Sequence, residues 1–265
     1  MKMKPDYKNW VPKGMVYTVS VGFVLSVIGL LIFIFMRFGG GVTQKIFVVV
    51  FALLSIITGG GTVFCHVMYR AFDYNGKRQL SRHIIEGIAD YVKIQAGGTG
   101  LDVGCGSGAL TIACAKKNPQ AKMIGLDRWG AEYASFSKTL CEKNARIEGV
   151  SEQTDFLQGD AKSLPFPDES FDVVTSNYVY HNITGADKQK LLQETLRVLK
   201  KGGRFAIHDL MSKARYGDME TFVAELKAKG YAEVALIDTT KGMFMSPQEA
   251  RLLFLSGSTL LVGQK

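Results

Sequence analysis

The chain has 265 residues, of which 47% are hydrophobic and 21% are charged, enough for one ordinary domain with a sizeable core and an additional part. Its mean hydropathy of +0.09 is high for a soluble enzyme and indicates a membrane part. The net charge of +8 is uneven, because residues 1–98 carry eleven Lys/Arg against four Asp/Glu and the remainder is nearly balanced. This distribution argues against a nucleic-acid partner and favours either an anionic lipid surface or simple topology signalling by basic flanks.

The four cysteines show no spacing typical of a disulfide framework or a metal site. Cys65, Cys105, Cys114 and Cys141 form no C-x-x-C pair and no Cys/His cluster with zinc spacing. We expect reduced thiols and no metal.

Two uncharged apolar runs in the first third of the chain are long enough to cross a membrane. Residues 15–36 and 46–69 both reach the roughly 20 residues that span a hydrocarbon layer about 30 Å thick. A short glycine-rich turn joins them, which predicts a helical hairpin within an N-terminal segment 1–72. A cleaved signal peptide is the competing interpretation. It is disfavoured because the first run is too long, lacks a small-x-small cleavage site and is followed directly by a second span.

Basic residues flank the outer ends of the two spans and are fewer in the turn between them. By the positive-inside rule, both ends and the rest of the chain face the cytoplasm, as in an integral protein of the cell membrane. The glycine-rich second span could also pair with a copy of itself in a homo-oligomer. The basic residues are Lys2, Lys4, Lys8 and Lys13 before the spans, Arg37 and Lys45 in the turn, and Arg70, Lys77, Arg78 and Arg82 after them.

The remaining two-thirds of the chain alternates short apolar strands with amphipathic helices. Helical spacing over 77–95 predicts a connecting amphipathic helix within a segment 73–98. From residue 99 onward the alternation predicts a doubly wound α/β domain, 99–265. The predicted strands are 99–104, 122–127, 154–158, 171–177, 203–209, 233–238 and 258–264, and the predicted helices are 108–117, 130–148, 185–200, 218–229 and 246–255.

A glycine turn joins the first predicted strand to the helix that follows it. Residues 101–108 read LDVGCGSG, with glycines at 104, 106 and 108. Glycine adopts positive φ and lets the backbone approach a ligand, while the free N–H groups of the next helix point toward that ligand. The spacing is G-x-G-x-G, which differs from the G-x-G-x-x-G of dinucleotide folds.

Acidic residues follow the next two predicted strands. Asp127 ends the second strand, about 20 residues after the glycine turn, where a carboxylate can accept both hydroxyls of a ribose. Asp160 ends the third, where its side chain can accept from an adenine amino group. Ligands bind at the carboxyl ends of strands in such sheets, so these residues should converge.

Together these motifs resemble the class I S-adenosylmethionine-dependent methyltransferases, especially the small-molecule branch that includes quinone C-methyltransferases. The resemblance rests on LDVGCGSG, GLD at 125–127, GDAKSLPFPDESFDVV, SNYVYHNI and LRVLKKGGRF, and it extends over 101–210. It implies a Rossmann-like, seven-stranded domain, the cofactor S-adenosyl-L-methionine and a small-molecule acceptor.

The resemblance also implies cofactor-binding roles at matching positions. The glycine turn would lie beneath the methionine part of the cofactor, with Asp102 supporting its amino group through water. Asp127 would hold the ribose, with Arg128 beside the adenosine. The remaining expected contacts come from the turn and the strand ends: Gly104, Cys105, Gly106, Gly108, Asp160, Ala161, Ser176 and Asn177.

Methyl transfer requires that acceptor, methyl carbon and sulfur lie on one line, and it requires a base only when the acceptor arrives protonated. His181, after the fourth strand, is the first candidate base, and His208 with Asp209 is the second. His181 could instead cap or pack over the cofactor, and His208 could be a buried residue of its strand.

The apolar residues Leu210, Met211, Met243, Phe244 and Met245 predict an apolar rim, which suits a lipophilic acceptor such as a quinone-like ring, a lipid amine or a thiol. Enzymes that methylate amino groups of nucleic-acid bases usually carry an N/D-P-P-Y/F motif after the fourth strand. This chain has SNYV there, which argues against a nucleic-acid acceptor. The alternatives are a cofactor-binding membrane scaffold without turnover and a nicotinamide oxidoreductase.

Overall fold

The computed structural model describes residues 3–36, 41–130 and 135–265. Two compact units divide the chain. One combines the described part of Met1–Lys8 with His83–Lys265, and the other is Asn9–Arg82. Lys2, Arg37 and part of the predicted helix 130–148 lie outside the described residues.

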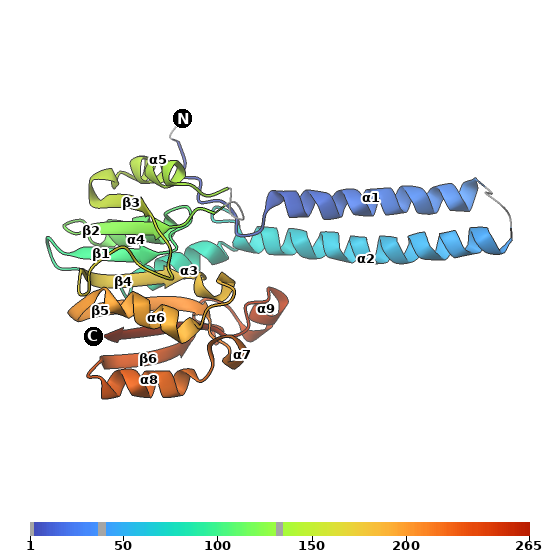
Figure 1. Cartoon of the computed structure of the whole chain (residues 1–265). Coiled ribbons are helices and arrows are strands. Elements are labelled where there is room, and N and C mark those ends of the chain that lie inside the picture. The colour runs from blue at the N-terminus through green and yellow to red at the C-terminus, as the bar shows by residue number, and fades with distance from the viewer. Residues whose placement is uncertain (1–2, 37–40, 131–134) are drawn as a thin grey trace. The chain divides into compact units, whose positions relative to one another are not determined.

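The second unit contains two long antiparallel helices, α1 (Lys13–Phe35) and α2 (Val42–Phe72) (Figure 1). Small residues allow them to pack closely, since a Cβ on Gly29 would lie 2.3 Å from the Phe51 ring and one on Gly59 would lie 2.9 Å from the Phe23 ring. Ser26 and Thr58 share a hydrogen bond of 3.2 Å between the helices. By length and apolar composition, both helices can cross a membrane, and most of their large apolar side chains are exposed.

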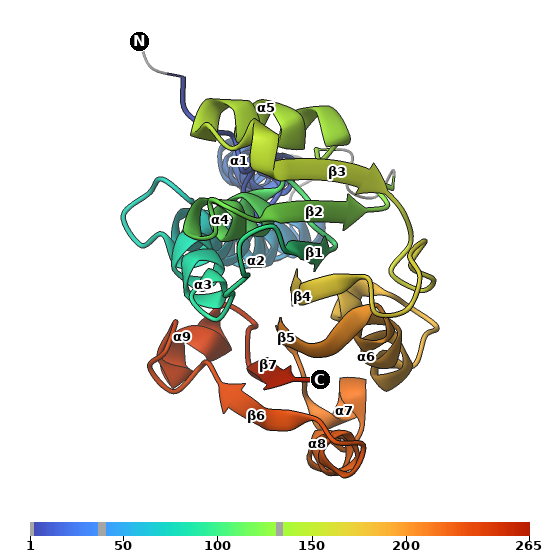
Figure 2. The same ribbon diagram turned by 90° about the vertical axis from the view of Figure 1, so that its left-hand side faces the viewer.

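The other unit is built on a seven-stranded sheet in the order β3-β2-β1-β4-β5-β7-β6. β7 runs antiparallel to both of its neighbours, whereas the remaining pairs are parallel. Helices cover both faces of the sheet, with α3 and α4 on one side and α6 and α8 on the other (Figure 2). The predicted Rossmann-like fold is confirmed.

The strands and helices occupy the following ranges. The strands are β1 (Thr99–Val103), β2 (Lys122–Asp127), β3 (Thr154–Gln158), β4 (Phe171–Asn177), β5 (Leu199–Leu210), β6 (Ala232–Asp238) and β7 (Ser258–Gln264). The helices are α3 (Leu80–Ala89), α4 (Ala109–Lys117), α5 (Lys138–Glu148), α6 (Lys188–Arg197), α7 (Lys213–Tyr216), α8 (Met219–Ala228) and α9 (Pro247–Leu252), with 3₁₀ turns at Ser151–Gln153 and Tyr180–Asn182.

Side-chain caps explain where several helices begin. Asp187 accepts from the first N–H groups of α6, and Asp218 does the same for α8. Ser137 caps α5, so this helix begins later than predicted. The fifth strand begins earlier than the predicted 203, because β5 starts at Leu199 and contains an irregularity of register beside β4. Gly202, at a φ of 78°, provides the left-handed conformation that such a bulge uses.

Candidate active site

The glycine turn between β1 and α4 is left-handed at three positions. Gly104, Gly106 and Gly108 have φ values of 75°, 56° and 79°. A Cβ on Gly104 would lie 2.3 Å from Val179 and one on Gly108 would lie 3.0 Å from Phe156, so packing also requires glycine there. Among the described residues, no atom lies within 4 Å of a Cβ placed on Gly106. The turn is therefore closely packed beneath and open above Gly106, as a cradle for a ligand requires.

Asp127 lies at the rim of this cradle. One carboxylate oxygen accepts from the Gly106 N–H at 2.8 Å, and the other accepts from the Trp129 N–H at 2.8 Å. The Trp129 indole N–H in turn donates to the Gly106 carbonyl at 3.0 Å. A carboxylate has four lone-pair sites, so Asp127 retains acceptor capacity for two hydroxyl groups. Arg128 is exposed beside it.

Asp160 follows β3 on the same edge of the sheet. One of its carboxylate oxygens accepts from the Lys162 N–H at 2.9 Å, which fixes the start of the loop. Ala161 is buried directly after it. The structure thus places Asp160 at the end of the strand next to the one that carries Asp127.

Asp102 is buried within the sheet. Its carboxylate accepts from the Thr111 hydroxyl at 2.7 Å and from the Thr175 hydroxyl at 3.1 Å. Burial raises the pKa of Asp102 to about 6, even though both hydroxyl groups favour its charged form. The side chain therefore joins β1 to α4 and β4.

Two further predicted contacts have buried side chains. Ser176 donates to the Val103 carbonyl at 2.8 Å, which ties β4 to β1. Burial raises the pKa of the Cys105 thiol well above its ordinary value, so this cysteine stays protonated.

His208 is enclosed at the end of β5. Its Nδ1 lies 2.9 Å from Asn177 Oδ1, and its Nε2 lies 3.0 Å from the Thr239 hydroxyl. Burial lowers the pKa of His208 to about 3, against the attraction of the Asp209 charge. The ring is neutral, and because Asn177 Oδ1 only accepts, Nδ1 carries the proton. Nδ1 is bonded to Asn177, and Nε2 is enclosed beside Thr239, whose hydroxyl donates to the Ser258 carbonyl at 3.0 Å. His208 therefore orients Asn177, and the geometry disfavours it as a base.

His181 and Asp209 form a dyad where the 3₁₀ turn after β4 meets the end of β5. His181 Nδ1 lies 2.5 Å from Asp209 Oδ1, and the His181 backbone N–H lies 3.2 Å from Oδ2. The His181 side chain is 18% exposed, whereas that of Asp209 is fully buried. Burial raises the pKa of Asp209, but the hydrogen bond and charge of His181 and the Leu210 N–H outweigh it, so the pKa lies below its ordinary value. Nε2 is left as the His181 nitrogen able to accept a proton.

Several predicted rim residues instead belong to the core. Leu210, Met211, Phe244 and Met245 are all buried, and only Met243 is exposed. Alternation along β5 and packing of the 239–245 loop direct these side chains inward. Tyr178 and Tyr180 also pack, with hydroxyls bonded to Ser258 and Thr195 at 2.6 Å each.

Comparisons with known proteins match the same part of the chain. Residues 101–207 match the family model described as a methyltransferase domain. This part of the chain is therefore similar to a methyltransferase domain. A demethylmenaquinone methyltransferase from Lactobacillus johnsonii is 38% identical over 117 residues, which are 44% of this chain and 45% of the relative. The chain therefore matches about half the length of that relative.

Two solved structures share the fold of the methyltransferase domain. The [4+2]-cyclase SpnF aligns with a TM-score of 0.55 at 20% identity, covering 73% of this chain and 85% of its own. A geranyl diphosphate methyltransferase in complex with GPP and sinefungin aligns with a TM-score of 0.54 at 14% identity, covering 72% and 82%. The fold therefore occurs in proteins named for different reactions.

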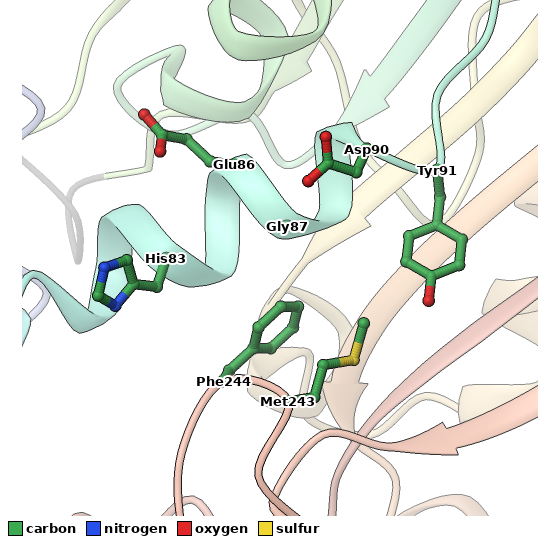
Figure 3. Close-up of a pocket in the computed structure, with 7 residues that line it drawn as sticks. All are labelled: His83, Glu86, Gly87, Asp90, Tyr91, Met243 and Phe244. Carbon is green, nitrogen blue, oxygen red and sulfur yellow. The ribbon is translucent and has the colours of Figure 1, made fainter.

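A cavity of about 600 Å³ lies beside the methyltransferase domain, between α3 and the loop after β6 (Figure 3). In Figure 3 the Phe244 ring lies across from Gly87, and Met243 points into the same space. The Phe244 ring is 5.5 Å from His208, whose ring is 4.6 Å from Tyr178, so an aromatic row separates the cavity from the dyad. The cavity is lined by His83, Glu86, Gly87, Asp90, Tyr91, Met243 and Phe244, and so contains no predicted cofactor-binding residue.

The N-terminal segment contacts the glycine turn, which sequence reasoning missed. The Ser107 hydroxyl donates to the Tyr7 carbonyl at 2.8 Å. The buried Asn144 amide of α5 bonds both the N–H and the carbonyl of Asp6, at 2.8 and 2.9 Å. Only the unusual position of Asn144 on the buried face of a helix signals a polar partner in the sequence. Thr239 was also missed, and no motif marks it.

Proposed function

We propose that this protein is a membrane-anchored methyltransferase that transfers a methyl group from S-adenosyl-L-methionine to a small lipophilic acceptor. The observation that carries this proposal is the cradle formed by three left-handed glycines, open above Gly106, with Asp127 at its rim. The match of 101–207 to a methyltransferase domain supports it.

The residues at this edge of the sheet fit the parts of the cofactor. Asp127 would accept from the two ribose hydroxyls, and Asp160 with the Ala161 backbone would bind the adenine. The turn would receive the methionine part, near Asn177, whose side-chain oxygen is held by His208. Arg128 would contact the adenosine. Asp102, Cys105 and Ser176 would shape this site from below, since their side chains are buried.

The cofactor, when bound, supplies a methyl group attached to a sulfonium sulfur. This sulfur leaves readily as a neutral thioether when the methyl group is transferred. The chain's own residues would align the acceptor and remove its proton. Asp209 would hold His181 with its proton on Nδ1, so that Nε2 accepts the proton from the acceptor. Asp209 would then stabilise the imidazolium that forms.

Two observations support a lipophilic acceptor. The Lactobacillus johnsonii relative is named for demethylmenaquinone, and the solved geranyl diphosphate methyltransferase is named for a prenyl diphosphate. In addition, α1 and α2 are long enough to hold the methyltransferase domain at a bilayer, where such compounds dissolve. The basic flanks of the hairpin support a cytoplasmic position for this domain.

The test uses the full chain in lipid nanodiscs, labelled S-adenosylmethionine and a membrane lipid extract as acceptor source. We expect label in the lipid fraction, and His181→Asn and Asp209→Asn should each slow the transfer about 100-fold or more. S-adenosylhomocysteine should bind these variants as it binds the parent, because neither residue belongs to the cradle. His66→Asn is the matched control, since His66 bonds a carbonyl of its own helix α2 and should not change the rate.

Other results would point to the alternatives. Tight binding of S-adenosylhomocysteine without label transfer to the extract indicates a scaffold or a different reaction. Binding of NADH in place of S-adenosylhomocysteine indicates an oxidoreductase. Transfer only to soluble polar acceptors contradicts the lipophilic assignment.

A further inference from the structure

Three of the exposed apolar side chains of His83–Lys265 belong to α9, the residues just after it and the loop that leads into it. Among the described residues of His83–Lys265, the large apolar side chains with high exposure are Phe254 (71%), Leu252 (53%), Met243 (39%) and Tyr91 (37%). Met243 and Tyr91 line the same cavity. We call Leu252 and Phe254, at the end of α9, the α9 corner.

Phe254 has a left-handed backbone conformation, which six other non-glycine residues among those described share. Its φ is 57°, and it follows α9 where the Leu255 N–H bonds the Ala250 carbonyl at 2.8 Å. Helices that end in this way usually carry glycine or asparagine at the left-handed position. A bulky residue there is strained, and a side chain that remains 71% exposed recovers little stability by burial. The end of α9 therefore keeps a large aromatic side chain at the surface.

The α9 corner is held rigidly. Ser246 caps the start of α9 by accepting from the Glu249 N–H at 3.2 Å. After the helix, the Ser258 N–H donates to the Leu255 carbonyl at 3.0 Å, and the Met211 N–H donates to the Gly257 carbonyl at 2.9 Å. These bonds fix the corner to the ends of β5 and β7, so its apolar side chains are presented on an ordered surface.

The chain itself keeps this corner within reach of a bilayer. Ten residues, 73–82, separate α2 from His83 and extend at most about 35 Å. With α2 in the membrane, the folded unit has a high effective concentration at the lipid surface. Lys213 and Arg215 of α7 are exposed, and α7 begins next to the corner, because a Cβ on Gly257 would lie 3.4 Å from Ser212. Aromatic and aliphatic side chains beside basic residues suit the interface of an anionic bilayer.

We propose that the α9 corner docks on the bilayer, with Leu252 and Phe254 inserted among the lipid headgroups, and that this docking opens the adjacent cavity to acceptors dissolved in the membrane. The inference rests on the membrane anchoring proposed above. Met243, which precedes α9 by four residues, lines the cavity, and its neighbour Phe244 begins the aromatic row that lies between the cavity and the dyad.

The test places a fluorophore beside the corner and a quencher in the lipid. Cysteine labelling is selective, because all four native cysteines are buried. The Ser256→Cys variant of the full chain is labelled with bimane. It is then reconstituted, one copy per nanodisc, in phosphatidylethanolamine and phosphatidylglycerol. The quencher is a lipid that carries a spin label at carbon 5 of its acyl chain. We expect at least a twofold loss of emission. Ile28→Cys in α1 reports on the span. The unquenched control is the exposed Lys229→Cys, which lies just before the start of β6 and hence at the opposite end of that strand from α9.

Adding Phe254→Gly or Leu252→Asn to Ser256→Cys should return the emission to the Lys229→Cys level. Phe254→Gly keeps the domain folded, because glycine suits the left-handed position. Quenching at Ile28 without quenching at Ser256 overturns the docking proposal and leaves the anchor standing. Quenching at Ser256 that survives both substitutions overturns the role of these side chains. Loss of quenching at Ile28 as well overturns the anchor and the docking together, independently of any methyl-transfer assay.

Discussion

Asp102 shows how a single residue of the glycine motif depends on the fold around it. Its carboxyl is buried between β1, α4 and β4 and has a pKa of about 6, compared with 3.8 for an ordinary aspartate. In the folded state it therefore binds a proton over a pH range in which the unfolded chain does not. The folded state gains stability from this proton at low pH and loses it as the pH rises toward 6. Above that pH the loss amounts to about 3 kcal/mol.

Asp102→Asn should remove this loss, because an amide keeps an acceptor for Thr111 and carries no charge. We expect the substitution to raise the melting temperature of the full chain in detergent at pH 8 and to have little effect at pH 4. Asp172→Asn is the control, and it should lower the melting temperature at neutral pH instead of raising it. Burial raises the pKa of Asp172, but the Thr99 N–H and Lys200 lower it further, so its carboxylate stabilises the fold at neutral pH. An equal shift for Asp102→Asn at both pH values would refute the elevated pKa.

At the residue scale, the sequence predicts the glycine turn and the end of β2 more readily than it predicts which side chains meet. The glycines and Asp127 were predictable because a sharp turn and a strand end impose their residue types locally. The two histidines could not be separated in this way. His208 is buried by the 239–245 loop, whereas His181 meets Asp209 from a neighbouring strand. Such contacts depend on tertiary packing, which one sequence does not reveal.

At the scale of elements, the seven strands were predicted nearly in full because buried parallel strands form short, continuous apolar runs. The limits of the helices were predicted less well, since Ser137 and Asp187 cap α5 and α6 inside longer helical patterns. The contact of residues 3–8 with α5 was not predictable, because it joins positions 138 residues apart. This segment resembles a basic flank in the sequence and is part of the folded unit in the structure.

Asn144→Ala tests this N-terminal contact. Its buried amide bonds Asp6 at both backbone groups and the Ser107 carbonyl at 3.0 Å, and alanine leaves these groups without those partners. We expect a loss of about 3 kcal/mol in the unfolding free energy and faster amide exchange in residues 3–8. Tyr7→Phe, which removes only the hydroxyl bond to Glu148, should cost about 1 kcal/mol or less. Equal effects of the two substitutions would argue against Asn144 as the main anchor.

For the whole molecule, the same contact constrains how the chain can cross a membrane. Asp6 is bonded to Asn144, so residues 3–8 lie on the same side as the folded unit. The chain between them must then cross an even number of times, which agrees with α1 and α2 as two spans. This argument does not depend on hydropathy. It also disfavours a cleaved signal peptide, since cleavage after the first apolar run would remove Asp6.

Labelling of introduced cysteines tests this topology in intact cells. The exposed Thr43, near the start of α2, should react as Thr43→Cys with a membrane-impermeant maleimide added outside, because it lies at the end of the hairpin away from the basic flanks. Lys229→Cys should react only after the membrane is permeabilised, because it belongs to the folded unit. The parent chain, with four buried cysteines, gives the background. Labelling of Lys229→Cys but not of Thr43→Cys in intact cells would place the methyltransferase domain outside the cell, away from cytoplasmic S-adenosylmethionine. Protection of both sites in intact cells would contradict a hairpin that crosses the bilayer.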